Sequence, residues 1–122
     1  MNVLVIEDKP TSRELVVYLL SRAGHYVVEA HDGPTGLRAA RATAFDMILC
    51  DLSMPGMHGF EVAKALRADP KTAKALLICV TMHDGPGIES EVLRAGFDVY
   101  YVKPIDAPQF VQGLEALFQA HK

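Results

Sequence analysis

Five short apolar runs, separated by segments with helical spacing, constrain the fold of this chain more than any other feature. The runs have the length and the aliphatic, β-branched character of strands, and they cover residues 2–6, 26–30, 46–50, 76–80 and 99–102. The central runs lack polar alternation, as expected when both faces of a parallel sheet are covered. Repeated alternation of strand and helix predicts an α/β fold, with helices on both faces of a parallel sheet and right-handed crossovers.

The segments between the runs carry apolar stripes that predict the buried face of each helix. The expected stripes are Leu15, Tyr18, Leu19 and Ala23; Leu37, Ala40 and Ala44; Val62, Ala63 and Leu66; Val92, Leu93 and Ala95; and Phe110, Leu114, Leu117 and Phe118. Gly24 and Gly96 are the expected stops of the first and fourth helices. Pro70 predicts that the third helix ends at Asp69, and Asp106 is the expected N-cap of the last helix.

Length and composition restrict the class of protein. A chain of 122 residues predicts one domain, and a net charge of −3 argues against direct binding to nucleic acid. No apolar run reaches the roughly 18 residues needed to cross a bilayer, and the acidic pair in MNVLVIED interrupts any signal peptide. We therefore expect a cytoplasmic protein with no membrane contact. Cys50 and Cys79 lie inside apolar runs and are expected to be buried, unpaired thiols.

Polar side chains follow four of the five predicted strands. Glu7 and Asp8 follow the first run, Asp51 the third, Thr81 the fourth and Lys103 the fifth. Each has a plain alternative role, as a helix cap, a turn residue, a strand-end residue or a surface lysine. The carboxyl ends of parallel strands, however, meet at one edge, where ligands bind in open α/β sheets. Three carboxylates gathered there would repel one another unless a positive charge lies among them.

The donor types predict which cation fits. Carboxylates and backbone carbonyls are the ligands of hard divalent ions, and the five histidines show no ligand spacing, so zinc is disfavoured. Mg²⁺ is the expected ion, with Mn²⁺ as a possible substitute.

In their order and spacing, these residues resemble the receiver domains of bacterial two-component response regulators, including the single-domain chemotaxis type. The resemblance covers Asn2 to about Gln119 and rests on the motifs VLVIED, DLSMPGMHG (51–59), VT (80–81) and GFDVYYVKPI (96–105). It implies one receiver domain over residues 1–122, with a flavodoxin-like, doubly wound five-stranded sheet in the order 2-1-3-4-5. It also implies a signalling domain rather than an enzyme, catalysing only its own phosphorylation and slow dephosphorylation.

The resemblance further implies a phosphoacceptor. Asp51 would accept a phosphoryl group from a phosphohistidine of a sensor histidine kinase or a histidine phosphotransfer protein. Asp8, Asp51 and the Ser53 carbonyl would hold Mg²⁺, and Glu7 would act on the metal mainly through water. A protein promotes phosphoryl transfer mainly by positioning the reacting groups and neutralising their charge. A metal on one side of the phosphoryl group and Lys103 on the other would supply that neutralising charge.

The remaining implications concern the switch. Thr81 and Lys103 would contact phosphoryl oxygens, and the Lys103–Pro104 peptide bond would be cis. Thr81 and Tyr100 would then move, changing a face made by helix 4, strand 5 and helix 5 that binds a downstream protein or an output domain. Tyr101 is expected only to pack on its strand.

Several positions depart from the family pattern. Glu7 stands where aspartate is commoner and should preserve metal binding, and Ile105 replaces the usual phenylalanine. Met82 stands where the family usually has a small residue, so its bulk is expected to restrict the site or to alter the switch. Ser53 and His83 occupy positions that tune hydrolysis of the acyl phosphate in the family.

Three alternatives belong to other classes. The first is a receiver-like interaction module that is not phosphorylated, for which Met82 is the best argument. The second is a flavodoxin-like cofactor binder, but the segment EDKPTS after the first strand is acidic and would repel a phosphate. The third is a dedicated hydrolase, for which no separate general base stands out. The chain is expected to be a stand-alone regulator, with the first domain of a longer protein as the alternative.

Overall fold

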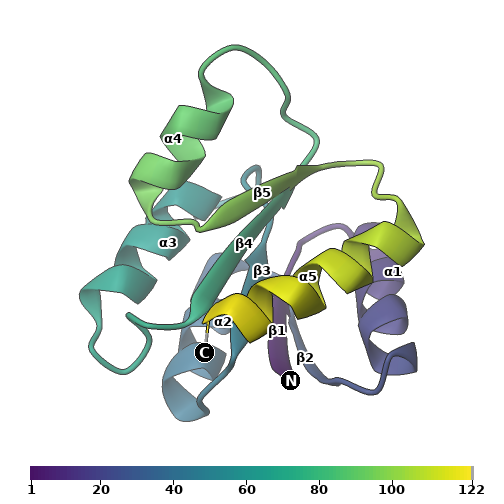
Figure 1. The fold of residues 1–122 in the computed structure, drawn as a ribbon. Coiled ribbons are helices and arrows are strands. Elements are labelled where there is room, and N and C mark those ends of the chain that lie inside the picture. The colour runs from purple at the N-terminus through teal and green to yellow at the C-terminus, as the bar shows by residue number, and fades with distance from the viewer. Residues whose placement is uncertain (122) are drawn as a thin grey trace.

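The computed structural model describes residues 1–121, in which five strands alternate with five helices (Figure 1). The strands are β1 (Asn2–Ile6), β2 (Tyr26–Ala30), β3 (Met47–Cys50), β4 (Leu76–Thr81) and β5 (Val99–Val102). The helices are α1 (Pro10–Arg22), α2 (Gly33–Ala42), α3 (Gly59–Ala68), α4 (Ile88–Ala95) and α5 (Ala107–His121). All strand pairs are parallel and the order is β2-β1-β3-β4-β5, which confirms the predicted fold class. Lys122, the last residue of the predicted domain, lies outside the described residues.

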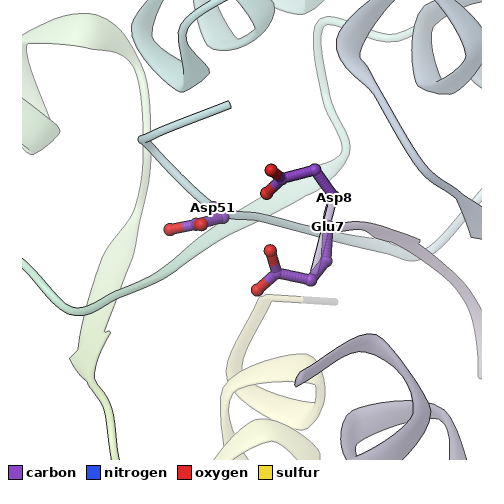
Figure 2. A group of neighbouring side chains, drawn as sticks. All are labelled: Glu7, Asp8 and Asp51. Carbon is purple, nitrogen blue, oxygen red and sulfur yellow. The ribbon is translucent and has the colours of Figure 1, made fainter. Parts of the chain in front are cut away.

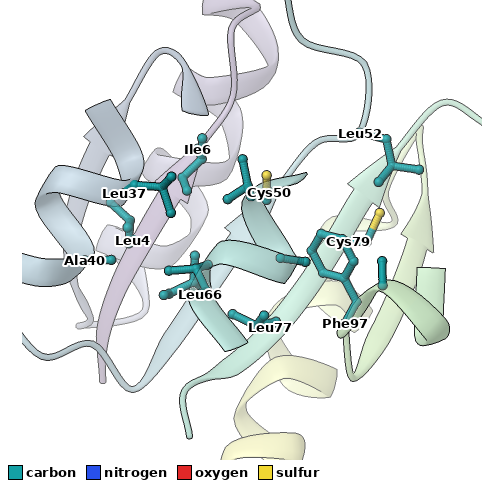
Figure 3. Packing of buried hydrophobic residues seen from close by; sticks show 14 of the residues in the cluster. Leu4, Ile6, Leu37, Ala40, Cys50, Leu52, Leu66, Leu77, Cys79 and Phe97 are labelled. Carbon is teal, nitrogen blue, oxygen red and sulfur yellow. The ribbon is translucent and has the colours of Figure 1, made fainter. Parts of the chain in front are cut away.

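The sheet separates two hydrophobic clusters, because successive side chains of a strand point to opposite faces. On one face, Leu4, Ile6 and Cys50 pack against residues of α2, α3 and α4 (Figure 3). Ile48 belongs to the same cluster. On the other face, neighbouring strand residues pack against α1 and α5; this second cluster is Val3, Val5, Val16, Leu20, Met47, Leu49, Leu76, Ile78, Val80, Phe110 and Leu114. Both faces of the central strands are therefore shielded from solvent, as predicted from their unbroken apolar sequences.

The predicted buried face of the first helix is wrong by about one residue. Val16 and Leu20 are buried in α1, whereas Leu15 is 47% exposed and Tyr18 is 57% exposed. The sequence LVVYLL is apolar all round, so periodicity alone does not distinguish the stripe through Val16 from the one through Leu15. The docking of α1 on the sheet decides between the two stripes.

The other helices follow their predicted faces more closely. Leu37 and Ala40 are buried in α2, but Ala44 lies beyond its end and is exposed. Leu93 of α4 was also wrongly placed in the buried stripe, because it is 46% exposed while Val92 and Ala95 face the core. Val62, Ala63 and Leu66 of α3 are buried, as are Phe110 and Leu114 of α5.

The predicted C-terminal ends of α1, α3 and α4 and the two predicted thiols agree with the structure. Asp69 is the C-cap of α3, and Gly24 adopts a φ of 92° just after α1, in the left-handed region that favours glycine. Cys50 and Cys79 are buried free thiols, and burial raises the pKa of Cys79 to about 12. Within residues 1–121, every helix is too short or too polar to span a bilayer.

Candidate functional site

The topology places the carboxylates at the point where the strand order reverses. The chain leaves β1 toward β2 on one side and returns to β3 on the other, so a crevice opens at the carboxyl ends of β1 and β3. Ile6 pairs with Cys50, so Glu7 and Asp51, the next residues along, lie side by side. This register brings together the acidic residues that the sequence separates by more than forty positions.

Glu7, Asp8 and Asp51 form one acidic cluster, with a carboxylate oxygen from each lying within 4.8 Å of the others (Figure 2). Glu7 is 5% exposed and Asp51 is 4% exposed, so two of the three carboxyl groups are almost withdrawn from water. The Oδ1 atom of Asp8 is buried and has no hydrogen-bond partner among residues 1–121. A buried acceptor without a partner is costly unless something outside the protein chain satisfies it.

The two oxygens of Asp51 have different surroundings. The Leu52 N–H donates to Oδ1 at 2.8 Å, and Oδ2 lies 3.8 Å from the Lys103 ammonium. The Asp51 N–H donates to the Ile6 carbonyl at 3.2 Å, which fixes the backbone beneath the carboxylate. The carboxylate is therefore held by its own loop, with one oxygen turned toward a cation.

Lys103 crosses the site from the end of β5. Its ammonium makes an ion pair and a hydrogen bond with Glu7, and its backbone N–H donates to the Thr81 carbonyl at 2.8 Å. The Lys103–Pro104 peptide bond is cis, in agreement with the expectation from the sequence. Lys103 thus lies between the carboxylates of β1 and β3, closer to Glu7 than to Asp51.

Burial is the main cause of a raised pKa at Glu7, and the neighbouring charge of Asp51 raises that pKa further, while Lys103 opposes both. A raised pKa in the folded state means that Glu7 contributes stability below its ordinary pKa of 4.5. That contribution is lost as the pH rises through the raised value, so the ionised Glu7 costs stability at neutral pH.

We therefore expect Mg²⁺ to stabilise the protein in a pH-dependent way. Added Mg²⁺ should raise Tm more at pH 7.5 than at pH 4.5, because the pKa of Glu7 is raised by burial, so this carboxyl group takes up a proton as the pH falls and the cluster attracts the ion less. Thermal unfolding at both pH values, with and without millimolar Mg²⁺, measures the effect. The variant Asp84→Asn, in the exposed β4–α4 loop, should respond like wild type. An equal rise in Tm at both pH values would contradict the assignment to this cluster.

The donor set suits a hard divalent cation. Three carboxylates bring oxygen atoms close together and one lysine offsets only part of their charge, while the Asp8 Oδ1, unpaired among residues 1–121, is an available ligand atom. Oxygen-only ligation of this kind fits Mg²⁺ or Mn²⁺ rather than zinc.

Gly59 holds the loop after Asp51 in place. A Cβ at Gly59 would lie 2.8 Å from the Cα of Leu52 and would also clash with the backbone of Asp51. The Gly59 N–H donates to the Leu52 carbonyl at 2.8 Å, so α3 begins directly against the loop that follows Asp51.

We expect Gly59→Ala to destabilise the protein by about 1–3 kcal/mol, because the backbone must shift to admit the methyl group. Gly85→Ala is the matched control, since a Cβ there meets nothing within 4 Å. Urea unfolding of both variants measures the difference. Equal stability of Gly59→Ala and wild type would show that the loop tolerates the shift.

The rim of the site contains the other predicted residues. Thr81 is fully buried, and its Oγ1 accepts a hydrogen bond from the His83 N–H at 3.2 Å. The exposed side chains of Ser53 and His83 hydrogen-bond each other through Oγ and Nε2, joining the loops after β3 and β4. Met82 is 66% exposed and points away from the core.

The two tyrosines of β5 lie on opposite faces of the sheet. Tyr100 is half-buried on the side of α4, and burial followed by the charges of Asp84 and Glu89 raises its pKa. Tyr101 packs edge-on against Phe110 of α5, with ring centroids 5.1 Å apart, which agrees with its predicted packing role. Tyr100 therefore packs on the face of the sheet that α4 covers.

Sequence reasoning missed two basic residues near the site. Arg13 donates to the Glu7 carbonyl at 2.7 Å and pairs with Glu29 at 3.2 Å, which ties α1 to β1 and β2. The Lys9 ammonium donates to the Met82 sulfur at 3.6 Å. Neither residue belongs to a motif, and the contact of Lys9 links positions 73 apart, so no local signal marks it.

The fold and this acidic crevice agree with the comparison to known families. The family model described as the response regulator receiver domain matches residues 3–115, so this chain belongs to that family, which comprises signalling domains of two-component systems. Among individual relatives, the chemotaxis protein CheY of Pseudomonas aeruginosa is 32% identical over 120 residues, which cover 98% of this chain and 97% of that protein.

Solved structures show the same fold. Chemotaxis response regulator CheY4 of Vibrio cholerae superposes with a TM-score of 0.89 at 30% identity, covering 95% of this chain and 97% of that one. The receiver domain of sensor histidine kinase PA1611 from Pseudomonas aeruginosa superposes with a TM-score of 0.89 at 24% identity, covering 97% of each chain, and holds a magnesium ion in its active-site cleft. Other relatives are longer, and this chain matches between 13% and 53% of their length.

Proposed function

We propose that Asp51 accepts a phosphoryl group in a Mg²⁺-dependent reaction and that the protein relays this event as a receiver. The observation that carries the proposal is the setting of Asp51, with one carboxylate oxygen held by the Leu52 N–H and the other facing Lys103 beside an unsatisfied acidic cluster. A carboxylate is a sufficient nucleophile for an acyl phosphate. The receiver domain of PA1611, with magnesium in its cleft on the same fold, supports the assignment of the ion.

In the proposed reaction, an oxygen of Asp51 forms a bond to phosphorus as the bond between phosphorus and the donor imidazole nitrogen breaks. The imidazole leaves with the electron pair of that bond and takes up a proton from water. Asp8, Asp51 and the Ser53 carbonyl would hold Mg²⁺, or Mn²⁺ in its place, with Glu7 acting through water. The ion would neutralise charge on the phosphoryl oxygens.

The residues of the chain would supply positioning and the remaining charge. Lys103 would exchange part of its contact with Glu7 for a phosphoryl oxygen, because its ammonium already lies 3.8 Å from Asp51. Thr81 would release the His83 N–H and donate its hydroxyl to another oxygen. Ser53 and His83, joined above the site, would set the access of water and so the lifetime of the acyl phosphate.

The signal would leave through α4, β5 and α5. Movement of Thr81 would shift the loop that begins at Met82, because its Oγ1 accepts from the His83 N–H, and the charge of Asp84 in that loop acts on Tyr100. The phosphoryl group would favour one of two arrangements of this face through its differential contacts. The expected donor is a sensor histidine kinase or a histidine phosphotransfer protein, and the expected receiver of the signal is a downstream protein or an output domain.

Intact-mass analysis after incubation with acetyl phosphate tests the proposal. We expect a gain of one phosphoryl group with Mg²⁺ and no gain with EDTA, and peptide mapping should place the group on residues 47–58. No gain in a folded protein that binds Mg²⁺, in wild type and in Met82→Ala alike, would overturn the proposal in favour of a phosphorylation-silent interaction module.

A further inference from the structure

We propose that Lys9 and Met82 form a strap across Asp51 that restricts small phosphodonors and water while yielding to a protein donor. The strap consists of the contact between the Lys9 ammonium and the Met82 sulfur, which are 3.6 Å apart. This inference rests on the proposed function, because it concerns access to the same acceptor carboxylate.

The strand order places the strap over the acceptor. Lys9 lies in the loop after β1 and Met82 in the loop after β4, and β3 lies between these two strands in the sheet. A contact between the two loops therefore spans the carboxyl end of β3, the strand that Asp51 follows. The hydrogen bond between Ser53 and His83 joins the loops after β3 and β4 separately.

The strap is anchored on the side of Lys9 and free on the side of Met82. The Lys9 N–H donates to Glu7 Oε2 at 3.3 Å, so the base of the lysine is attached to the acidic cluster. Met82 is 66% exposed, and a thioether is a weak acceptor, so little free energy holds the contact closed. Such a contact narrows the approach to the site while it is closed and opens at small cost.

A cavity beside Met82 can accommodate its side chain when the strap is open. Met82 borders an apolar cavity of about 320 Å³ between α1 and the β5–α5 loop, lined also by Leu15, Val80, Pro104 and Ile105. Leu15, at 47% exposed, adds apolar surface next to it. A protein donor that covers this surface would gain contacts with Met82 as the strap opens, whereas a small donor gains none.

The strap therefore predicts a selective effect on small molecules. Met82→Ala should raise the rate of phosphorylation by acetyl phosphate and the rate of acyl phosphate hydrolysis by a factor of roughly three to ten, because access no longer requires opening. Met82→Leu keeps the bulk but loses the sulfur acceptor, so it should move most of the way toward Met82→Ala. Tm should stay near the wild-type value, since Met82 is not part of the core.

The first measurement tests the contact without any phosphoryl chemistry. In protein labelled with ¹³C at the methionine methyl groups, Lys9→Gln should shift the Met82 resonance and leave that of the buried Met54 in place. Lys64→Gln, an exposed lysine on α3, is the matched control and should shift neither. No response of Met82 to Lys9→Gln would overturn the strap, whatever becomes of the proposed function.

The second measurement compares rates in wild type, Met82→Ala, Met82→Leu and Lys9→Gln/Met82→Ala. Faster reaction in Met82→Ala and Met82→Leu, with little further gain in the double variant, supports the strap. Reaction rates in Met82→Ala equal to those of wild type would overturn the strap. A faster reaction in Met82→Ala together with a wild-type rate in Met82→Leu would overturn the role of the Lys9 contact and assign the effect to the bulk of residue 82. If neither wild type nor Met82→Ala takes up a phosphoryl group, the proposed function is contradicted and the strap as a donor filter falls with it, whereas uptake by Met82→Ala alone supports both.

Discussion

Asp51→Asn should abolish phosphoryl incorporation and stabilise the protein when no divalent cation is present. The asparagine amide is a poor nucleophile, so no acyl phosphate forms. The substitution also removes one charge from a cluster in which two carboxyl groups are nearly buried, while keeping an oxygen that accepts from the Leu52 N–H. Relief of this repulsion is expected to increase the free energy of unfolding by on the order of 1 kcal/mol.

Two measurements check the Asp51→Asn prediction. Intact mass after acetyl phosphate and Mg²⁺ should show no added group, and urea unfolding in EDTA should show the gain in stability. Asp84→Asn, in the exposed loop before α4, is the matched control and should keep wild-type labelling. Wild-type labelling of Asp51→Asn would place the acceptor elsewhere, and a loss of stability would show that the apo cluster is not repulsive.

The positions of β1, β3 and β4 were predictable because their burial on both faces leaves a clear apolar signal, and the partly exposed edge strands β2 and β5 still keep short runs rich in valine and tyrosine. The observed strands differ from the predicted runs only in losing Asp46 and gaining Thr81. The buried face of α1 was not predictable, because LVVYLL offers two apolar stripes and only the docking of α1 through Val16 and Leu20 selects one.

The acidic cluster followed from the sequence for a different reason. A residue that ends a parallel strand must lie at the carboxyl edge of the sheet, so Glu7, Asp8 and Asp51 converge without any knowledge of side-chain conformation. No comparable rule predicts from the sequence which side chains of different loops come into contact. The approaches of Lys9 to Met82 and of Arg13 to the Glu7 carbonyl depend on side-chain conformations that the three-dimensional structure sets.

Lys103→Met should reduce phosphoryl incorporation by a factor on the order of 10² to 10³, because a fixed positive charge that faces the transferring group is lost. The variant keeps most of the length of the apolar stem but leaves Glu7, at 5% exposed, without the ammonium that pairs with it. Breaking one side of a buried ion pair typically costs about 3 kcal/mol or more at neutral pH.

The loss of stability in Lys103→Met should shrink as the pH falls. Burial and Asp51 already raise the pKa of Glu7, and removal of Lys103 eliminates the effect that lowers it, so Glu7 takes up a proton more readily in the variant. Urea unfolding at pH 7.5 and pH 5 should show the larger deficit at pH 7.5. Glu7→Gln/Lys103→Met should recover most of the stability and none of the phosphoryl incorporation, which separates the two roles of Lys103. A deficit that is independent of pH, or undiminished in the double variant, would show that Lys103 stabilises the fold through its stem rather than by pairing with Glu7.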